Sequence, residues 1–250
     1  MRVALFVTCL TDQFYPRTGI AAVKVLEHLG CHVEFPLEQT CCGQPMYNNG
    51  LHAQAAALAR RFVTIFEPFE AIITPSGSCA AMVRRHFADL LNSDPAWRDR
   101  AAAVSARTYE FVEFLDRVLK FNSVTAGVRW PGRATCHCAC HLRELGLFDL
   151  PRHFLSSIPG LDLAPLAGAE QCCGFGGTFS VKYVDPSMAM VTDKVDALIA
   201  SGTTTLVCND AGCAMNIEGA CRRRGVNVDI KSIAEILAEG LGLLPREGHG

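Results

Sequence analysis

The stretch EQTCCGQP (residues 38–45) places two adjacent cysteines before a glycine, and EQCCGFGG (residues 170–177) does so again. Neighbouring side chains point to different sides of an extended chain, so a core rarely needs both thiols of such a pair. The recurrence raises the question of which other cysteines keep the same spacing, because a shared spacing decides how the chain is organised.

The cysteines form two sets of four with matching spacing. The sets are Cys9, Cys41, Cys42 and Cys79, then Cys140, Cys172, Cys173 and Cys213. The first three members lie 131 residues from their counterparts, and the fourth lies 134 residues away. This collinear spacing indicates an internal duplication in which the sulfurs are the fixed points.

Secondary-structure patterns repeat in the same way. Short apolar or alternating runs predict strands at 3–7, 32–35, 71–74, 204–208 and 226–230. Helical spacing predicts helices at 19–30, 51–66, 186–202, 213–225 and 233–242. Alternating strands and helices predict an α/β fold with two pseudo-repeated halves, each with a mostly parallel sheet and one cysteine site.

The halves are expected to meet near residue 124. Residues 92–124 are predicted to form one or two connecting helices, and the Gly- and Pro-containing segment 125–135 a loop. The first repeat then spans 1–124 and the second 125–250. The end, LLPREGHG (243–250), is expected to be a frayed tail.

Composition narrows the class of protein. The 250 residues carry 23 Lys and Arg against 25 Asp and Glu, a net charge of −2, which gives no reason to expect nucleic acid as a partner. No uncharged apolar stretch approaches the length of a membrane span, and the N-terminal run predicts a buried strand rather than a signal peptide. We therefore expect a cytoplasmic protein without membrane insertion.

Thirteen cysteines without an export signal indicate reduced thiols rather than a disulfide framework. Three of the eight repeated cysteines, at positions 9, 79 and 213, follow a predicted strand, where α/β folds collect their chemistry. Thiolates are the ligands that iron–sulfur clusters and zinc both take. Short Cys-x2-4-Cys pairs typical of zinc are absent from both sets, so the pattern favours a cluster, with zinc as the alternative.

Other candidates have simpler alternatives. Cys136, Cys138 and Cys208 are possible extra ligands, although ordinary packing is the favoured interpretation. His137 and His141 flank Cys140 and are candidates for catalytic proton transfer, with a polar role beside the ligands as the alternative. The GFGG segment (174–177) lacks the register of a nucleotide-binding loop.

Long collinear motifs carry a resemblance to a known family. These are VTCLTD (7–12), GCHVEFP (30–36), QTCCGQPMYNNG (39–50), TPSGSC (74–79), CHLRELG (140–146), EQCCGFGGTFSVKY (170–183) and GCAMNIEG (212–219). Both halves resemble the cysteine-rich CCG domain that also occurs in heterodisulfide reductase, and the match is closest to the lactate-utilisation protein A family. The resemblance covers almost the whole chain.

The resemblance implies an iron–sulfur electron-transfer component of a system that oxidises L-lactate to pyruvate. It implies a small organic acid as substrate and partner subunits that include a ferredoxin-type iron–sulfur protein. The wider family has Cys-x-x-Cys where this chain has Ser76 to Cys79 and Asp210 to Cys213. Each site then has four sulfurs, so we expect one or two [4Fe–4S] clusters.

Two functions of other classes stay open from the residues alone. One is a zinc-stabilised, non-catalytic scaffold for redox subunits. The other is a thiol–disulfide oxidoreductase that uses the adjacent cysteines. The chain shows no flavin or nicotinamide fingerprint, so we do not expect it to be a complete dehydrogenase alone.

Overall fold

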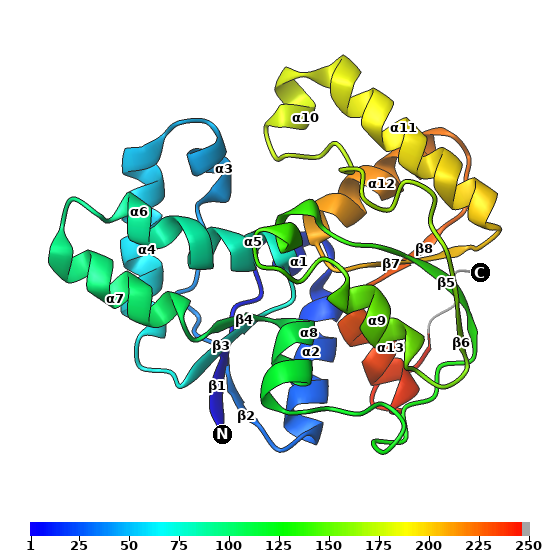
Figure 1. The fold of residues 1–250 in the computed structure, drawn as a ribbon, viewed down its shortest axis with the longest axis horizontal. Helices are drawn as coiled ribbons and strands as arrows, with labels where there is room; N and C mark the ends of the chain where they lie inside the picture. The colour runs from blue at the N-terminus through cyan, green and yellow to red at the C-terminus, as the bar shows by residue number, and fades with distance from the viewer. Residues whose placement is uncertain (247–250) are drawn as a thin grey trace.

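Each half of the chain builds one four-stranded parallel sheet, as the computed structural model shows for residues 1–246 (Figure 1). The first sheet has the order β2-β1-β3-β4 and the second the order β6-β5-β7-β8. Their strands are β1 (Arg2–Leu5), β2 (His32–Glu34), β3 (Ala71–Thr74), β4 (Thr108–Glu110), β5 (Gly132–His137), β6 (Leu161–Ala164), β7 (Thr205–Cys208) and β8 (Asp229–Lys231). The predicted α/β fold of two similar halves is confirmed, and every strand pair is parallel.

Helices connect the strands and cover the sheets. In the first half they are α1 (Cys9–Phe14), α2 (Pro16–His28), α3 (Gln44–Asn48), α4 (His52–Phe66), α5 (Gly77–Ala81), the π-helical turn Met82–His86, α6 (Phe87–Leu90), α7 (Pro95–Ser105), α8 (Phe111–Glu113) and the π-helical turn Phe114–Val118. In the second half they are the 3-10 turn Cys140–Arg143, α9 (Leu150–Ser156), α10 (Phe179–Lys182), α11 (Val184–Ser201), α12 (Ala211–Arg223) and α13 (Ile233–Gly240).

Local chemistry explains where several helices begin and end. The backbone N–H groups of Gly30 and Cys31 close the end of α2, and Gly30 has a φ of +83° that favours glycine. At the start of α13, Ser232 and Glu235 exchange side-chain and backbone hydrogen bonds in a capping box. These caps fix the lengths of the two helices that pack against each other at the centre of the molecule.

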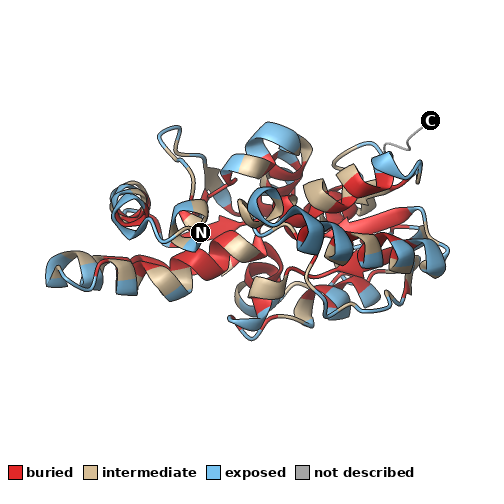
Figure 2. Cartoon of the chain, turned by 90° about the horizontal axis from the view of Figure 1, so that it is seen from above, coloured by how far each residue is buried: buried red, intermediate tan, exposed pale blue. Residues whose placement is uncertain are grey.

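Buried residues lie along the strands and on the inner faces of the helices (Figure 2), and their hydrophobic side chains form two cores. Alternate residues along β1 and directly after it face opposite sides: Val3 and Leu5 join a large core, while Ala4 and Phe6 join a smaller one under α4, α6 and α7. The large core continues through α2 and α13 into the second sheet. The halves therefore share one apolar interior and do not form separate globules.

The sequence pattern does not predict three of the strands. β4 lies within 92–124, so the prediction of helices alone there is wrong, and β5 begins inside the predicted loop 125–135. β6 is also missed. The tail prediction is wrong for the residues described, since Leu243 and Leu244 pack against the core and Arg246 lies 4.0 Å over the Trp130 ring. Residues 247–250 lie outside the described residues.

No helix in the described part of the chain is both long and apolar enough to cross a membrane. The large core includes residues from both sides of the predicted division between residues 124 and 125. The division itself stays a prediction.

Candidate metal centre

The sheet order brings three cysteine-bearing segments together in each half. Adjacent strands β2, β1 and β3 all point the same way, so the segments that follow them meet at one edge. In the sheet, β2 lies on one side of β1 and β3 lies on the other. In α/β folds, ligands bind where the strand order reverses in this way. The second half repeats the arrangement with β6, β5 and β7.

The first set of cysteines occupies these three segments. Cys9 begins α1 after β1, Cys41 and Cys42 lie between β2 and α3, and Cys79 lies in the first turn of α5 after β3. The Sγ atoms of Cys42 and Cys79 are 3.3 Å apart. The neighbouring thiols of Cys42 and Cys9 stabilise the charged form of Cys41, so the four thiols form one group.

The second set repeats this geometry. Cys140 begins the turn after β5, Cys172 and Cys173 follow β6, and Cys213 lies in the first turn of α12 after β7. The Sγ atoms of Cys173 and Cys213 are 3.1 Å apart, and those of Cys140 and Cys172 are 3.9 Å apart. The structure therefore brings all four predicted members of each set together.

One sulfur in each set is favoured as a thiolate. Hydrogen bonds from Cys42 and then Cys9 lower the pKa of Cys41 to about 3, and those from Cys140 and Cys173 lower the pKa of Cys172 to about 2. The pKa values of the donating thiols Cys9 and Cys140 are raised, first because they donate these bonds. Thiolate is the form that binds metals, so each set holds one sulfur ready to bind.

Glycines make room for the adjacent cysteines. Gly43 and Gly174 have φ of +88° and +80°, and their N–H groups lie 3.4 Å from the sulfurs of Cys41 and Cys172. A Cβ on Gly174 would stand only 2.7 Å from the Ser187 carbonyl oxygen. The glycine after each pair therefore allows a backbone N–H to face sulfur, an interaction that stabilises negative charge in metal–thiolate sites.

A single cavity of about 310 Å³ lies between the two sets. All eight repeated cysteines line it, together with polar residues that include Thr8, Asn48, His141 and Asp210. A water occupies about 30 Å³ in the liquid, so the space far exceeds the needs of one bare ion. Convergent thiols, glycine cradles and this volume fit metal centres larger than a single ion.

Ser76 and Asp210 join the two halves at this cavity. They begin the segments Ser76–Cys79 and Asp210–Cys213, and their side chains cap α5 and α12. One Asp210 carboxylate oxygen accepts from the Ser76 hydroxyl at 2.8 Å and from the Ser78 N–H and hydroxyl at 3.0 and 2.6 Å. The Asp210 carboxylate thus holds the two repeats together at the cavity.

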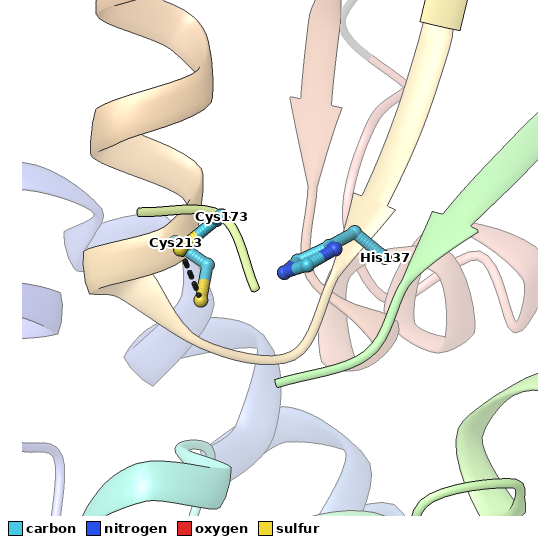
Figure 3. Close-up of side chains that lie close together, drawn as sticks. All are labelled: His137, Cys173 and Cys213. Carbon is cyan, nitrogen blue, oxygen red and sulfur yellow. Dashed lines mark hydrogen bonds between the residues drawn. The ribbon is translucent and has the colours of Figure 1, made fainter. Parts of the chain in front are cut away.

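The two candidate histidines take different places. His141 lines the cavity, with Nδ1 3.7 Å from the Cys140 sulfur. His137 ends β5, is fully buried, and its ring points toward Cys173 and Cys213 (Figure 3). Burial, and then the charge of Lys194, lowers the pKa of His137 to about 4. Burial likewise lowers the pKa of Lys194.

The remaining cysteines lie apart from the cavity. Cys136 and Cys138 are buried with sulfurs 3.8 Å apart, and Cys136 lines a different cavity beside Arg152. The Cys208 thiol donates to the Asp210 carbonyl at 3.3 Å. Cys31 and Cys221 belong to the large core.

Sequence reasoning missed Asp210 and Lys194. The position of Asp210 could have been found, because a capping residue two positions before the Gly-Cys pair signals the helix start. Lys194 gives no such signal, since it looks like an ordinary charge on the long helix α11.

The fold and the site define a class of duplicated α/β proteins with four cysteines in each half at one cavity. Comparison with known proteins shows the family to which the chain belongs. A family model described as "CCG: Cysteine-rich domain" matches residues 3–84 and 134–218, one copy in each half. "Lactate utilization protein A" of an Exiguobacterium strain is 47% identical over 96% of this chain and 98% of its own length. "Lactate utilization protein A" of Macrococcus caseolyticus is 45% identical over 95% of this chain and 96% of its own length.

The chain therefore belongs to the lactate utilization protein A family, and each half is a cysteine-rich CCG domain. This confirms the resemblance found in the sequence. Among solved structures, a "hypothetical protein from Helicobacter pylori" has a TM-score of 0.66 at 12% identity and covers 96% of this chain. The present chain spans about half (49%) of that structure, and the likeness concerns the fold alone.

Proposed function

We propose that this protein binds up to two iron–sulfur clusters at its eight repeated cysteines. In this proposal it is an electron-transfer component of a multi-protein system that oxidises lactate. The observation that carries the proposal is the convergence of two matching sets of four thiols on one cavity. The name shared by the relatives supports lactate as the compound on which the system acts.

The ligands of the first cluster would be Cys9, Cys41, Cys42 and Cys79. Those of the second would be Cys140, Cys172, Cys173 and Cys213. An iron–sulfur cluster, when bound, accepts and passes on single electrons. Four thiolates per site match the [4Fe–4S] type, and the N–H groups of Gly43 and Gly174 would offset the charge of the bound thiolates.

Conversion of lactate to pyruvate releases two electrons and two protons. Two one-electron sites around one cavity would accommodate both electrons. Asp210 is the only Asp, Glu, Lys or Arg among the described residues that line this cavity, and its carboxylate is already bonded to Ser76 and Ser78. Among the described residues, the cavity lining thus offers a lactate carboxylate no Lys or Arg, so we assign the carbon chemistry and the released protons to a partner protein.

The partners in this proposal are a protein that binds lactate and a ferredoxin-type protein that exchanges electrons with this chain. Mixing the purified chain with lactate alone should leave its visible absorbance unchanged. Adding the partner proteins should allow lactate to bleach that absorbance. Bleaching by lactate without partners would place the carbon chemistry on this chain.

Metal analysis and electron paramagnetic resonance (EPR) test the cluster assignment. Anaerobically purified protein should contain iron and acid-labile sulfide and give EPR signals after reduction with dithionite. Cys42→Ser and Cys173→Ser should each lose about half of the iron and one of the signals. Cys31→Ala removes a core thiol outside the cavity and should keep both signals.

Two results would overturn the cluster proposal. Colourless protein with stoichiometric zinc would indicate a zinc-stabilised scaffold. Metal-free protein with reversibly oxidised Cys41–Cys42 and Cys172–Cys173 pairs would indicate a thiol–disulfide enzyme.

A further inference from the structure

The buried residues that lie beside the sulfurs differ between the two cysteine sets. The strand register is the same in both sheets, since Ala4 pairs with Ile72 as Thr135 pairs with Leu206. Two residues later, Phe6, which directly follows β1, therefore corresponds to His137, the last residue of β5. An apolar ring in one repeat is replaced by an imidazole in the other.

A second replacement lies on the neighbouring helix. A Cβ on Gly43 would contact Leu58, and a Cβ on Gly174 would contact Met190, so these two helix positions are equivalent. One turn further on, Phe62 in α4 then corresponds to Lys194 in α11. The rings of Phe6 and Phe62 pack edge to face at 4.9 Å, so the first half has an aromatic pair where the second has an imidazole and an ammonium group.

His137 lacks what a buried imidazole normally has. Neither ring nitrogen has a hydrogen-bond partner among the described residues, although the side chain is fully buried. Leaving such a buried group unpaired is unfavourable, and an unseen ion is one of the standard reasons for it. Two sulfurs lie close to the imidazole: donor atoms of His137, Cys173 and Cys213 all lie within 4.8 Å of one another (Figure 3).

Lys194 also points to a negatively charged centre. Its side chain is buried, and its ammonium group donates to the Gly168 carbonyl oxygen. Cys172, Cys173 and Cys213 contribute favourably to its charged form. A buried cation beside several thiolates is stabilised when those thiolates carry a net negative metal centre.

We propose that His137 is a metal ligand at the second site, which then has five protein donors where the first site has four. This inference rests on the proposed function, because the metal is taken to be iron of a cluster. The Lys194 charge makes the second cluster easier to reduce than the first, since a nearby cation offsets negative charge around the iron. The neutral imidazole acts in the opposite direction, because it donates electron density to the iron.

Pulsed EPR of the dithionite-reduced protein tests the ligand directly, because a bound imidazole nitrogen gives a strong hyperfine coupling. The native protein should show one such coupling, and incorporation of 15N-histidine should change it. His137→Phe, which copies the first site, should lose the coupling. His141→Phe, which alters the cavity histidine beside Cys140, should retain it.

The redox titration provides a second readout. In native protein the two signals should develop at different potentials, and in His137→Phe the potential of the second should shift while that of the first stays unchanged. Where His137→Phe does not fold, the 15N-labelled native protein still decides the question. Cluster signals without a coupled histidine nitrogen, or a coupling that survives in His137→Phe, would overturn this inference alone. Native protein without any cluster would overturn the proposed function as well.

Discussion

Gly174 is the residue at which the second cysteine site is most tightly built. Its φ of +80° is a conformation that side chains rarely adopt, and the nearest obstacle to a Cβ is backbone, the Ser187 carbonyl oxygen. A side-chain tip could rotate away, but this oxygen belongs to the first turns of α11. The position therefore combines backbone strain with a steric clash.

Gly174→Ala is expected to lower the free energy of unfolding by about 2–4 kcal/mol and to reduce iron binding at the second site. Gly50→Ala is the matched control, because Gly50 has a φ of +74° and nothing within 4 Å of its Cβ position. It should cost only about 1–2 kcal/mol and spare the iron. Urea unfolding and iron analysis measure both effects, and equal losses in the two variants would contradict the clash.

Glu110 connects protonation to stability. It is buried at the end of β4 and caps α8, with bonds from the N–H groups of Val112 and Glu113. Burial raises its pKa to about 8, above the unfolded value near 4.5. The native state therefore holds a proton that the unfolded state releases, and stability falls as the pH rises from about 4.5 to 8.

Glu110→Gln should remove that decline, with a gain at pH 8.5 relative to pH 5 on the order of a few kcal/mol over the wild-type protein. Urea unfolding under anaerobic conditions at several pH values measures it. Glu67→Gln, at a half-exposed carboxylate paired with Arg100, should keep the wild-type dependence. A parallel pH profile for wild type and Glu110→Gln would show that Glu110 is ionised throughout.

At the scale of elements, the starts of α5 and α12 are held together by one carboxylate. Asp210 caps its own helix through the Gly212 N–H and accepts three bonds from Ser76 and Ser78 across the repeat boundary. Cys79 and Cys213 lie in the first turns of these same helices. A change at Asp210 should therefore alter the positions of the cysteines at both sites.

Asp210→Asn is expected to destabilise the protein by about 1–3 kcal/mol, because the amide cannot accept all of these bonds. It should weaken iron retention at both sites in a competition with a chelator. Ser78→Ala removes one of the bonds and should produce a smaller loss of the same kind. Loss of iron from the second site alone would show that the Asp210 carboxylate does not support the first.

The sequence pattern predicts the elements whose residues are strongly apolar and periodic. β3 and α4 agree closely with their predicted ranges, since AIIT is wholly buried and α4 keeps one apolar face. β5 could not be recognised, because GRATCH has little apolar character and owes its place to pairing with β6 and β7. Without β5, the position of His137 at a strand end could not be inferred.

The residues of the candidate site likewise include some that the sequence predicts and some that it does not. Regular spacing in the chain is enough to group the eight cysteines, because a duplication preserves it. The wall behind the second set depends on which residues of β5 and α11 face the sulfurs, and this is set by register and packing. His137 could thus be singled out only as a neighbour of Cys140, and Lys194 not at all.

At the scale of the molecule, the two sites, one in each half, line the same cavity. The halves are also joined by contacts such as the bond from the Tyr15 hydroxyl to the Glu218 carboxylate at 2.6 Å. Two clusters on one cavity should be close enough for their unpaired electrons to interact.

Fully reduced native protein is expected to give a broadened EPR spectrum from two interacting clusters. Cys42→Ser and Cys173→Ser should each give a simpler spectrum from the single remaining site. The measurement compares linewidth and relaxation at several temperatures. A native spectrum equal to the sum of the two variant spectra would show that the clusters do not sense each other.

The matching sulfurs Cys9 and Cys140 differ in their access to solvent, since Cys9 is exposed and Cys140 half-buried. Damage in air should therefore follow an order, with oxygen and peroxide reaching the first centre before its counterpart. A sample opened to air would pass through a form that retains only the second centre. Peptide mass spectrometry during such exposure should find sulfinic acid at Cys9 earlier than at Cys140.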